Sequence, residues 1–207
     1  MALSTYADLL ASIKAWARRP DFSDALCADF VTLCEDRINT RLRIRAMEST
    51  LLLTTVAGTA TVALPTRYKA MKSIYLDEDR DNPLAWMPAE QLRLEYPGDE
   101  TARPLAYTTE GENLVLGPAP DSDYTIRGMF YQGFSPLSST TNSLWTNHPS
   151  IYLFGCLAEA WDYQTEDAKA DRYLKRFEIT AGDIEREDTM DRISGSSLQV
   201  RTDVAHY

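Results

Sequence analysis

The chain has 207 residues, 44% of them hydrophobic and 25% charged, and a net charge of -10. This composition fits one medium or two small globular domains. No run of about 18 apolar residues occurs, so we expect no membrane-spanning helix, and the N-terminal sequence has no basic segment typical of a signal peptide. An acidic chain should not bind duplex DNA tightly, because neutralising phosphates requires a basic surface.

Two amphipathic helices are predicted at the start of the chain. The first covers residues 6–18, with Thr5 as its N-cap, Asp8 in a capping-box position and Pro20 as its stop. The second covers residues 24–43, and the short connection favours antiparallel neighbours. Their expected apolar faces are Tyr6, Leu9, Leu10, Ile13 and Trp16, and Phe30, Leu33, Cys34, Ile38 and Leu42.

The pattern changes to that of β-strands after Ser49. Residues 50–56 and 59–64 flank Ala57-Gly58, which predicts a β-hairpin. A Ser/Thr-rich loop is expected at 135–147. A second hairpin is expected from residues 104–108 and 113–116, around Glu110-Gly111-Glu112. The remaining elements of this region are expected strands at 72–76, 84–87 and 124–131, a charged turn at 77–82 and a helix at 89–96.

Helical periodicity returns at Pro149, a residue that suits a first helical position. One helix follows directly, and a second opens at Glu166 or Asp167 and ends near Met190. Ser194 begins a Gly/Ser joint, typical of a flexible connection. The expected faces are Ile151, Phe154, Leu157, Ala158 and Trp161, and Ala170, Tyr173, Leu174, Phe177, Ala181 and Ile184.

These elements predict an α+β fold. The two helix pairs would form a four-helix bundle from residues 1–48 and 149–190, with a strand-rich insert at 49–148 and an extended C-terminal arm at 191–207. The aromatic residues Trp16, Phe154, Trp161 and Phe177 would fill the bundle core.

No pattern of residues predicts catalysis, a cofactor or a bound metal. Asp77, Asp79 and Asp81 fit the first three ligand positions of a calcium-binding loop, but Asn82 and Pro88 break the pattern, so a solvated turn is the favoured interpretation. The cysteines are expected as buried thiols in a reducing cytoplasm.

Hydrolytic motifs are also absent from the sequence. The two histidines, His148 and His206, do not accompany a nucleophile motif, and pairs such as Glu90 and Glu95 cannot be assigned as glycosidase acids from spacing. We therefore predict that the protein is not an enzyme.

The end of the second helix is unusually rich in arginine. Four arginines fall within nine residues, which is more than stabilisation of the helix dipole needs. Residues 1–50 are neutral, with seven Lys/Arg and seven Asp/Glu, whereas 51–150 and 151–207 each carry seven against twelve. We therefore predict that Arg37, Arg41, Arg43 and Arg45 contact an acidic surface of a neighbouring subunit or another protein.

The C-terminal tail alternates apolar and polar residues. Leu198, Val200, Thr202 and Val204 alternate, and Tyr207 ends the chain. Two interpretations stay open: the tail is disordered, or it is an extended arm that adds to the surface of a partner on assembly.

Several segments together resemble one family. TYADLLASIKAWARRPDF, FVTLCEDRINTRLRIRAMES, LPTRYKAMKSIYL and PSIYLFGCLAEAWDYQTED are similar to segments of the head-to-tail adaptor (connector) proteins of tailed bacteriophages, especially short-tailed phages. The resemblance extends from residue 5 to 188. Its most specific part is E-D-R-I-N-x-R-L-R-x-R-x-M-E, which contains the four arginines.

The resemblance implies a structural virion protein that assembles, in the host cytoplasm, as a ring of 12 copies beneath the portal protein. The ring would extend and enclose the DNA channel without binding DNA tightly, and it would anchor tail nozzle or fibre proteins. Relatives attach to the portal through a C-terminal arm, which here would comprise Leu198, Val200, Arg201, Val204 and Tyr207.

Two alternatives remain from the sequence. The first is a binding module or assembly factor that is absent from the finished particle. The second is a cell-wall hydrolase at the tail, which would need a cleft containing a carboxyl group of raised pKa.

Overall fold

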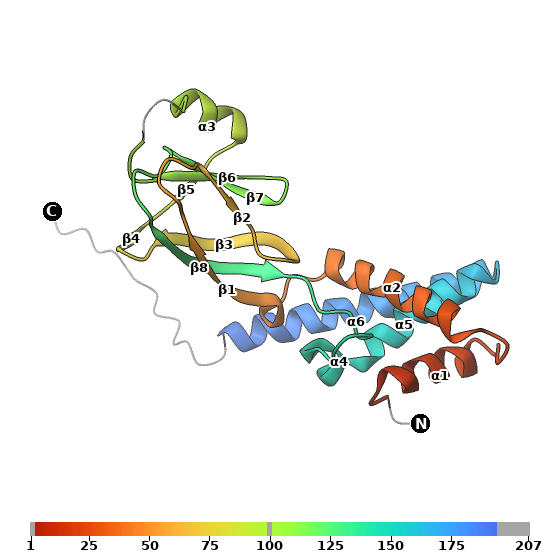
Figure 1. Cartoon of the computed structure of the whole chain (residues 1–207). Helices are drawn as coiled ribbons and strands as arrows, with labels where there is room; N and C mark the ends of the chain where they lie inside the picture. Colours follow the sequence, from red (N-terminus) through yellow and green to blue (C-terminus); the bar gives the residue numbers. More distant parts are fainter. Residues whose placement is uncertain (1–2, 99–100, 194–207) are drawn as a thin grey trace. The chain divides into compact units, whose positions relative to one another are not determined.

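The computed structural model describes residues 3–98 and 101–193, which form two compact units (Figure 1). The helical unit contains the described residues of 1–45 and 135–207, and the β unit contains those of 46–134. The 14 residues from 135 to 148, expected in the insert, thus belong to the helical unit.

The helical unit contains five α-helices within its described residues. The capping box expected at the start of α1 is present: the Thr5 side chain accepts from the Asp8 amide, and the Asp8 carboxylate accepts from the Thr5 amide. Ser23 caps α2 in a similar way, through the Leu26 amide. The helices are α1 (Tyr6–Trp16), α2 (Asp24–Arg41), α4 (Ser143–Asn147), α5 (Pro149–Tyr163) and α6 (Asp167–Ile193).

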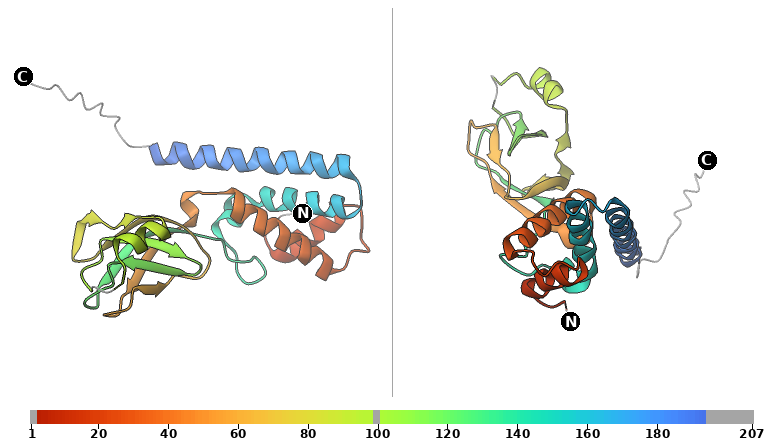
Figure 2. Two further views of the ribbon diagram at one scale, coloured as in Figure 1. Left: turned by 90° about the horizontal axis from the view of Figure 1, so that it is seen from above. Right: turned by 90° about the vertical axis from the view of Figure 1, so that its right-hand side faces the viewer.

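The predicted four-helix bundle is wrong, although the α+β class is confirmed. The described residues contain six α-helices, five of them in the helical unit, and two four-stranded sheets. Helix α5 is central: nine of its 15 residues are buried, and it packs against α1, α2, α4 and α6. Figure 2 shows α6 on one side of α5, with α1 and α2 on the other. The other helices therefore pack around α5. They do not form a four-helix bundle in which each helix contributes equally to one core.

Gly155 lets α2 and α6 approach α5 closely. A Cβ atom at this position would overlap Cys34 Sγ and would lie 3.2 Å from Phe177 Cδ2. Cys34 Sγ also donates to the carbonyl of Tyr152, at 3.5 Å. The three cysteines are buried free thiols, as expected, and burial raises the pKa of Cys156 well above its usual value.

Two residues assigned to apolar faces lie instead on the surface. The exposed fraction is 48% for Trp16 and 50% for Leu33. Leu33 lies at the edge of the apolar stripe of α2, where spacing alone does not distinguish a buried from an exposed position. Trp16 is the last residue of α1.

The predicted loop at 135–147 contains the short helix α4. Asn142 caps it by accepting from the Trp145 amide at 2.8 Å, and its amide nitrogen donates to the Tyr152 hydroxyl at 2.9 Å. The amide of Leu137 donates to Glu35 of α2 at 2.7 Å. These contacts attach the segment to α2 and α5, which the local Ser/Thr content could not indicate.

The β unit consists of two sheets around one core. The first sheet has the order β1-β8-β3-β4 and the second β2-β7-β6-β5. Among the strand pairs of the described residues, β5 and β6 are parallel and the others are antiparallel. Residues of both sheets, including Ile74, Leu116 and Phe130, form one buried cluster. The elements are β1 (Glu48–Thr54), β2 (Thr61–Ala63), β3 (Tyr68–Leu76), β4 (Asp79–Pro83), β5 (Ala85–Trp86), α3 (Ala89–Glu95), β6 (Ala106–Glu110), β7 (Asn113–Gly117) and β8 (Thr125–Gln132).

The hairpin predicted around Ala57-Gly58 is wrong. The chain does turn at Gly58, which has a φ of 74°, and Val56 and Thr59 form an isolated antiparallel bridge beside it. Strands β1 and β2, however, join different sheets. Strand β1 instead pairs with β8 over seven residues, and β2 pairs with β7. Pairing with these distant strands forms longer hydrogen-bonded ladders and buries a shared apolar core. These gains outweigh the advantage of closing a local hairpin. The expected hairpin of β6 and β7 is confirmed.

We predict opposite effects for alanine at two helical glycines. Gly155→Ala should destabilise the helical unit by about 1–3 kcal/mol, because overpacking at Cys34 outweighs the better helix propensity of alanine. Gly182→Ala should stabilise α6 by roughly 0.5–1 kcal/mol, because nothing lies within 4 Å of its Cβ position. Urea unfolding followed by circular dichroism measures both; equal effects would contradict the close packing of α5.

We predict that Glu35 lowers stability as the pH rises. Burial raises the pKa of Glu35 above its usual 4.5, despite the hydrogen bond from Leu137. The folded state therefore holds the proton more tightly than the unfolded state, so stability falls as the pH rises above about 4.5 through the folded-state pKa. Glu35→Gln keeps an acceptor for Leu137 and should be more stable than the wild type at pH 7 but not at pH 4. Equal pH dependence of the two unfolding free energies would exclude this.

Candidate functional site

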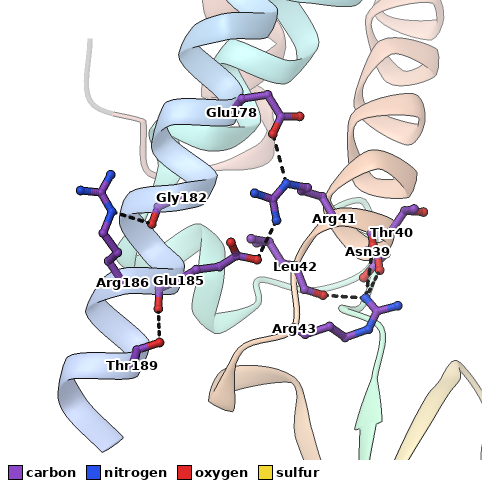
Figure 3. Close-up of polar contacts among 10 residues, drawn as sticks. All are labelled: Asn39, Thr40, Arg41, Leu42, Arg43, Glu178, Gly182, Glu185, Arg186 and Thr189. Atoms are coloured by element: carbon purple, nitrogen blue, oxygen red, sulfur yellow. Dashed lines mark hydrogen bonds and ion pairs between the residues drawn. The ribbon is translucent and has the colours of Figure 1, made fainter. Parts of the chain in front are cut away.

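The arginine-rich end of α2 lies against acidic side chains of α5 and α6. Arg37 forms an ion pair with Glu159 of α5, whose side chain is only 14% exposed. Arg41 lies between two carboxylates of α6, Glu178 at 3.1 Å and Glu185 at 2.7 Å (Figure 3). The two carboxylates raise the pKa of Arg41 further. We call the pairs formed by Arg37, Arg41 and Arg45 the arginine seam.

Arg45, the last arginine of the arginine seam, contacts the final turns of α6. The Arg45 backbone amide donates to Asp188 at 3.0 Å, and its guanidinium donates to Asp191 at 3.1 Å. Three arginines four residues apart thus meet carboxylates from two other helices. The helical repeat explains why Arg37 and Arg41 share one side of α2. Arg45 lies beyond the end of α2 at Arg41, in a separate 3-10 turn over Arg45–Met47.

Arg43 has a different role from the other three arginines. Its guanidinium donates to the carbonyls of Asn39 at 2.8 Å and Leu42 at 2.6 Å (Figure 3). These carbonyls lie at the C-terminal end of α2, where a helix leaves acceptors unsatisfied and carries partial negative charge. Arg43 therefore caps α2.

The structure gives a structural role to each of the four arginines predicted as a contact, Arg37, Arg41, Arg43 and Arg45. Their partners among the described residues are carboxylates or carbonyls of the same helical unit. The predicted contact with a neighbouring subunit or a portal protein is not tested by these contacts and stays a prediction. The predicted arm residues, Leu198, Val200, Arg201, Val204 and Tyr207, lie outside the described residues.

Two of the three aspartates that resembled a calcium-binding loop, Asp77 and Asp79, form ion pairs with arginines. Asp77 pairs with Arg80 at 2.8 Å and Arg127 at 3.0 Å, which lowers its pKa. Asp79 accepts from Asn82 and Arg103, which lowers its pKa too. The expected charged turn is wrong in extent, because Asp79–Pro83 is strand β4.

Residues 3–98 and 101–193 contain neither a cluster of metal ligands nor a membrane-spanning helix. No group of three or more His, Cys, Asp or Glu side chains in this part of the chain could hold a metal ion. No helix in it is long and apolar enough to cross a membrane. His148 lies at the junction of α4 and α5, with Nε2 3.8 Å from Glu187.

We predict that reversing Arg41 weakens the packing of α6. Arg41→Glu places a third carboxylate beside Glu178 and Glu185, and it should lower the free energy of unfolding by about 1–2 kcal/mol at low salt, less at high salt. Arg172→Glu, also on the helical unit, is the control, because Arg172 has no ion-pair partner among the described residues and should change stability little. Urea unfolding measures both; equal losses would contradict a role for the seam in folding.

Comparison with known proteins identifies the family. No curated protein matches the chain. A family model described as SU10 adaptor protein matches residues 4–201, which include both units and the arginine seam. The chain therefore belongs to the SU10 adaptor protein family and has the structural role of a phage head-to-tail adaptor.

Proposed function

We propose that this adaptor forms a ring beneath the portal protein, with 12 copies, and that the ring extends the DNA channel. The family match over residues 4–201 carries this proposal. The same ring would anchor nozzle or fibre proteins of the tail. The protein would be assembled in the host cytoplasm and remain in the virion.

The charge of the chain suits a DNA conduit. A net charge of -10 provides little attraction for phosphates. The most arginine-rich segment is already matched by carboxylates of α5 and α6, so it does not form an uncompensated basic patch. A channel built from such subunits would enclose DNA without retaining it.

We further propose that residues 194–207 attach the ring to the portal. The alternating sequence from Leu198 to Val204 suits an extended segment that pairs with a partner surface. The family model reaches residue 201 and so includes the first part of this segment. Leu198, Val200, Arg201, Val204 and Tyr207 would make the contact.

We propose a second contact through Arg37, Arg41, Arg43 and Arg45. The side chains of Arg41 and Arg45 are 38% and 50% exposed, so each keeps surface that its internal carboxylates do not cover. A neighbouring subunit or the portal would meet a surface of mixed charge there. Charge reversal at these sites therefore needs a parallel measurement of folding, since the same side chains hold α6.

We predict that the protein truncated after Ile193 folds but does not attach to its portal. The full chain, mixed with the portal protein, should form 12-membered rings by electron microscopy and native mass spectrometry. The truncated chain should keep its circular dichroism spectrum and lose at least about tenfold in portal affinity, because the arm contributes binding energy and not packing. Arg45→Glu, checked for folding, tests the second contact on the same mixture.

Three outcomes would count against these proposals. Rings of the truncated chain on the portal, equal to those of the full chain, would exclude the arm. Unchanged assembly of Arg45→Glu together with Arg43→Glu would exclude the arginine contact. Absence of the protein from purified particles, measured by mass spectrometry, would favour an assembly factor instead.

A further inference from the structure

Helix α6 carries a stripe of basic and apolar residues on the side turned away from α5. Phe177, Ala181 and Ile184 are the buried residues of α6. At 100° per residue, the stripe lies within about 40° of the direction opposite to Phe177. We call the part of it between residues 172 and 190 the α6 outer stripe; it consists of Arg172, Lys175, Ile179, Gly182, Arg186 and Met190.

This stripe differs in charge from the rest of α6. The helix contains eight Asp and Glu residues, and none lies within the α6 outer stripe. Arg172 and Lys175 have no ion-pair partner among the described residues, and Arg186 is paired only with Asp183, which flanks the stripe. An otherwise acidic helix thus presents three cations along one line.

The stripe also exposes apolar surface around a gap. Ile179 is 62% exposed and Met190 is 69% exposed. Gly182 lies between them, with open space where a Cβ would be. Glycine in the middle of a helix is less favourable than alanine, and no contact with the described residues requires it. Figure 3 shows Gly182 and Arg186 on α6 away from Arg41.

Helix α2 carries a stripe of opposite character. Asp29, Leu33, Asp36 and Thr40 follow one another at spacings of four, three and four, and we call them the α2 outer stripe. They are turned away from the buried residues Phe30, Cys34 and Ile38. Leu33 is 50% exposed, and Asp29 and Asp36 have no side-chain partner among the described residues.

We infer that the α2 outer stripe of one subunit docks against the α6 outer stripe of the next. Leu33 would fill the gap at Gly182, beside Ile179. The carboxylates of Asp29 and Asp36, roughly 10 Å apart along α2, would then meet Lys175 and Arg186, roughly 16 Å apart along α6. The long cationic side chains span this difference.

The partner of each stripe is a second copy of this chain, because the two stripes are complementary in charge and in shape. One stripe is acidic around one leucine, and the other is basic around an apolar gap. Because the two surfaces are different, the contact is head-to-tail, and repeating it produces a closed ring if the rotation closes. The inference rests on the proposed ring and identifies the surfaces that join its subunits.

A charge exchange between the two stripes tests this inference. One variant carries Asp29→Lys and Asp36→Lys, and the other Lys175→Glu and Arg186→Glu. Each alone should fold but require at least about tenfold more protein to form rings on the portal, because like charges would meet. An equal mixture of the two variants, and a chain carrying all four substitutions, should assemble like the wild type.

A pair of cysteines checks the same contact without changing charge. The full chain with Leu33→Cys and Gly182→Cys, assembled on the portal and treated with a mild oxidant that accepts the two thiol electrons, should form disulfide-linked multimers. Each single substitution should give monomers only. Dimers from one substitution alone would indicate a symmetric contact and overturn the head-to-tail arrangement.

The outcomes distinguish this inference from the proposed function. If the wild type forms no ring, the proposed function fails. If the wild type forms rings and both single-stripe variants do so equally well, the ring stands and this contact is wrong. If each variant fails and the four-fold substitution does not restore assembly, the α6 outer stripe meets the portal or nucleic acid, and the inference is overturned.

Discussion

The close contact between α5 and its neighbours is the constraint on which the helical unit depends. Gly155 has no side chain to separate α5 from Cys34 and Phe177, so α2 and α6 approach the same turn of α5 from two sides. Once α5 is enclosed in this way, only one side of α2 and one side of α6 remain for other contacts. The arrangement of the enclosing helices therefore decides which residues face outward.

The same arrangement divides the charges of the helical unit into two groups. Arg37, Arg41 and Arg45 face carboxylates of α5 and α6 and contribute to packing. Asp29, Asp36, Arg172 and Lys175 face outward. An exposed ion pair contributes at most about 1 kcal/mol, so the arginine seam determines the position of α6 more than it adds to the free energy of unfolding. The outward-facing charges remain available to contact a neighbouring protein.

The β unit is held by pairings between segments that are distant in sequence. Strand β1 pairs with β8, and β2 pairs with β7. The first sheet can therefore form only when the chain as far as Gln132, the end of β8, is present. Gly128 lets β8 lie close to β3, since a Cβ there would overlap the carbonyl of Ser73. The insert thus has a core of its own, separate from the helices.

The sequence by itself determined the local features of this protein. They are the Thr5 capping box, the helices at both ends, the β6–β7 hairpin and the family. All of them depend on residues close to one another in the chain. Only the tertiary structure decided the partner of each face. Leu33 and Phe30 show the same helical period, yet one is exposed and the other buried, and Arg41 pairs with Glu178, which lies 137 residues later. Periodicity marks a face of a helix, but the neighbour of that face is set by how distant segments pack.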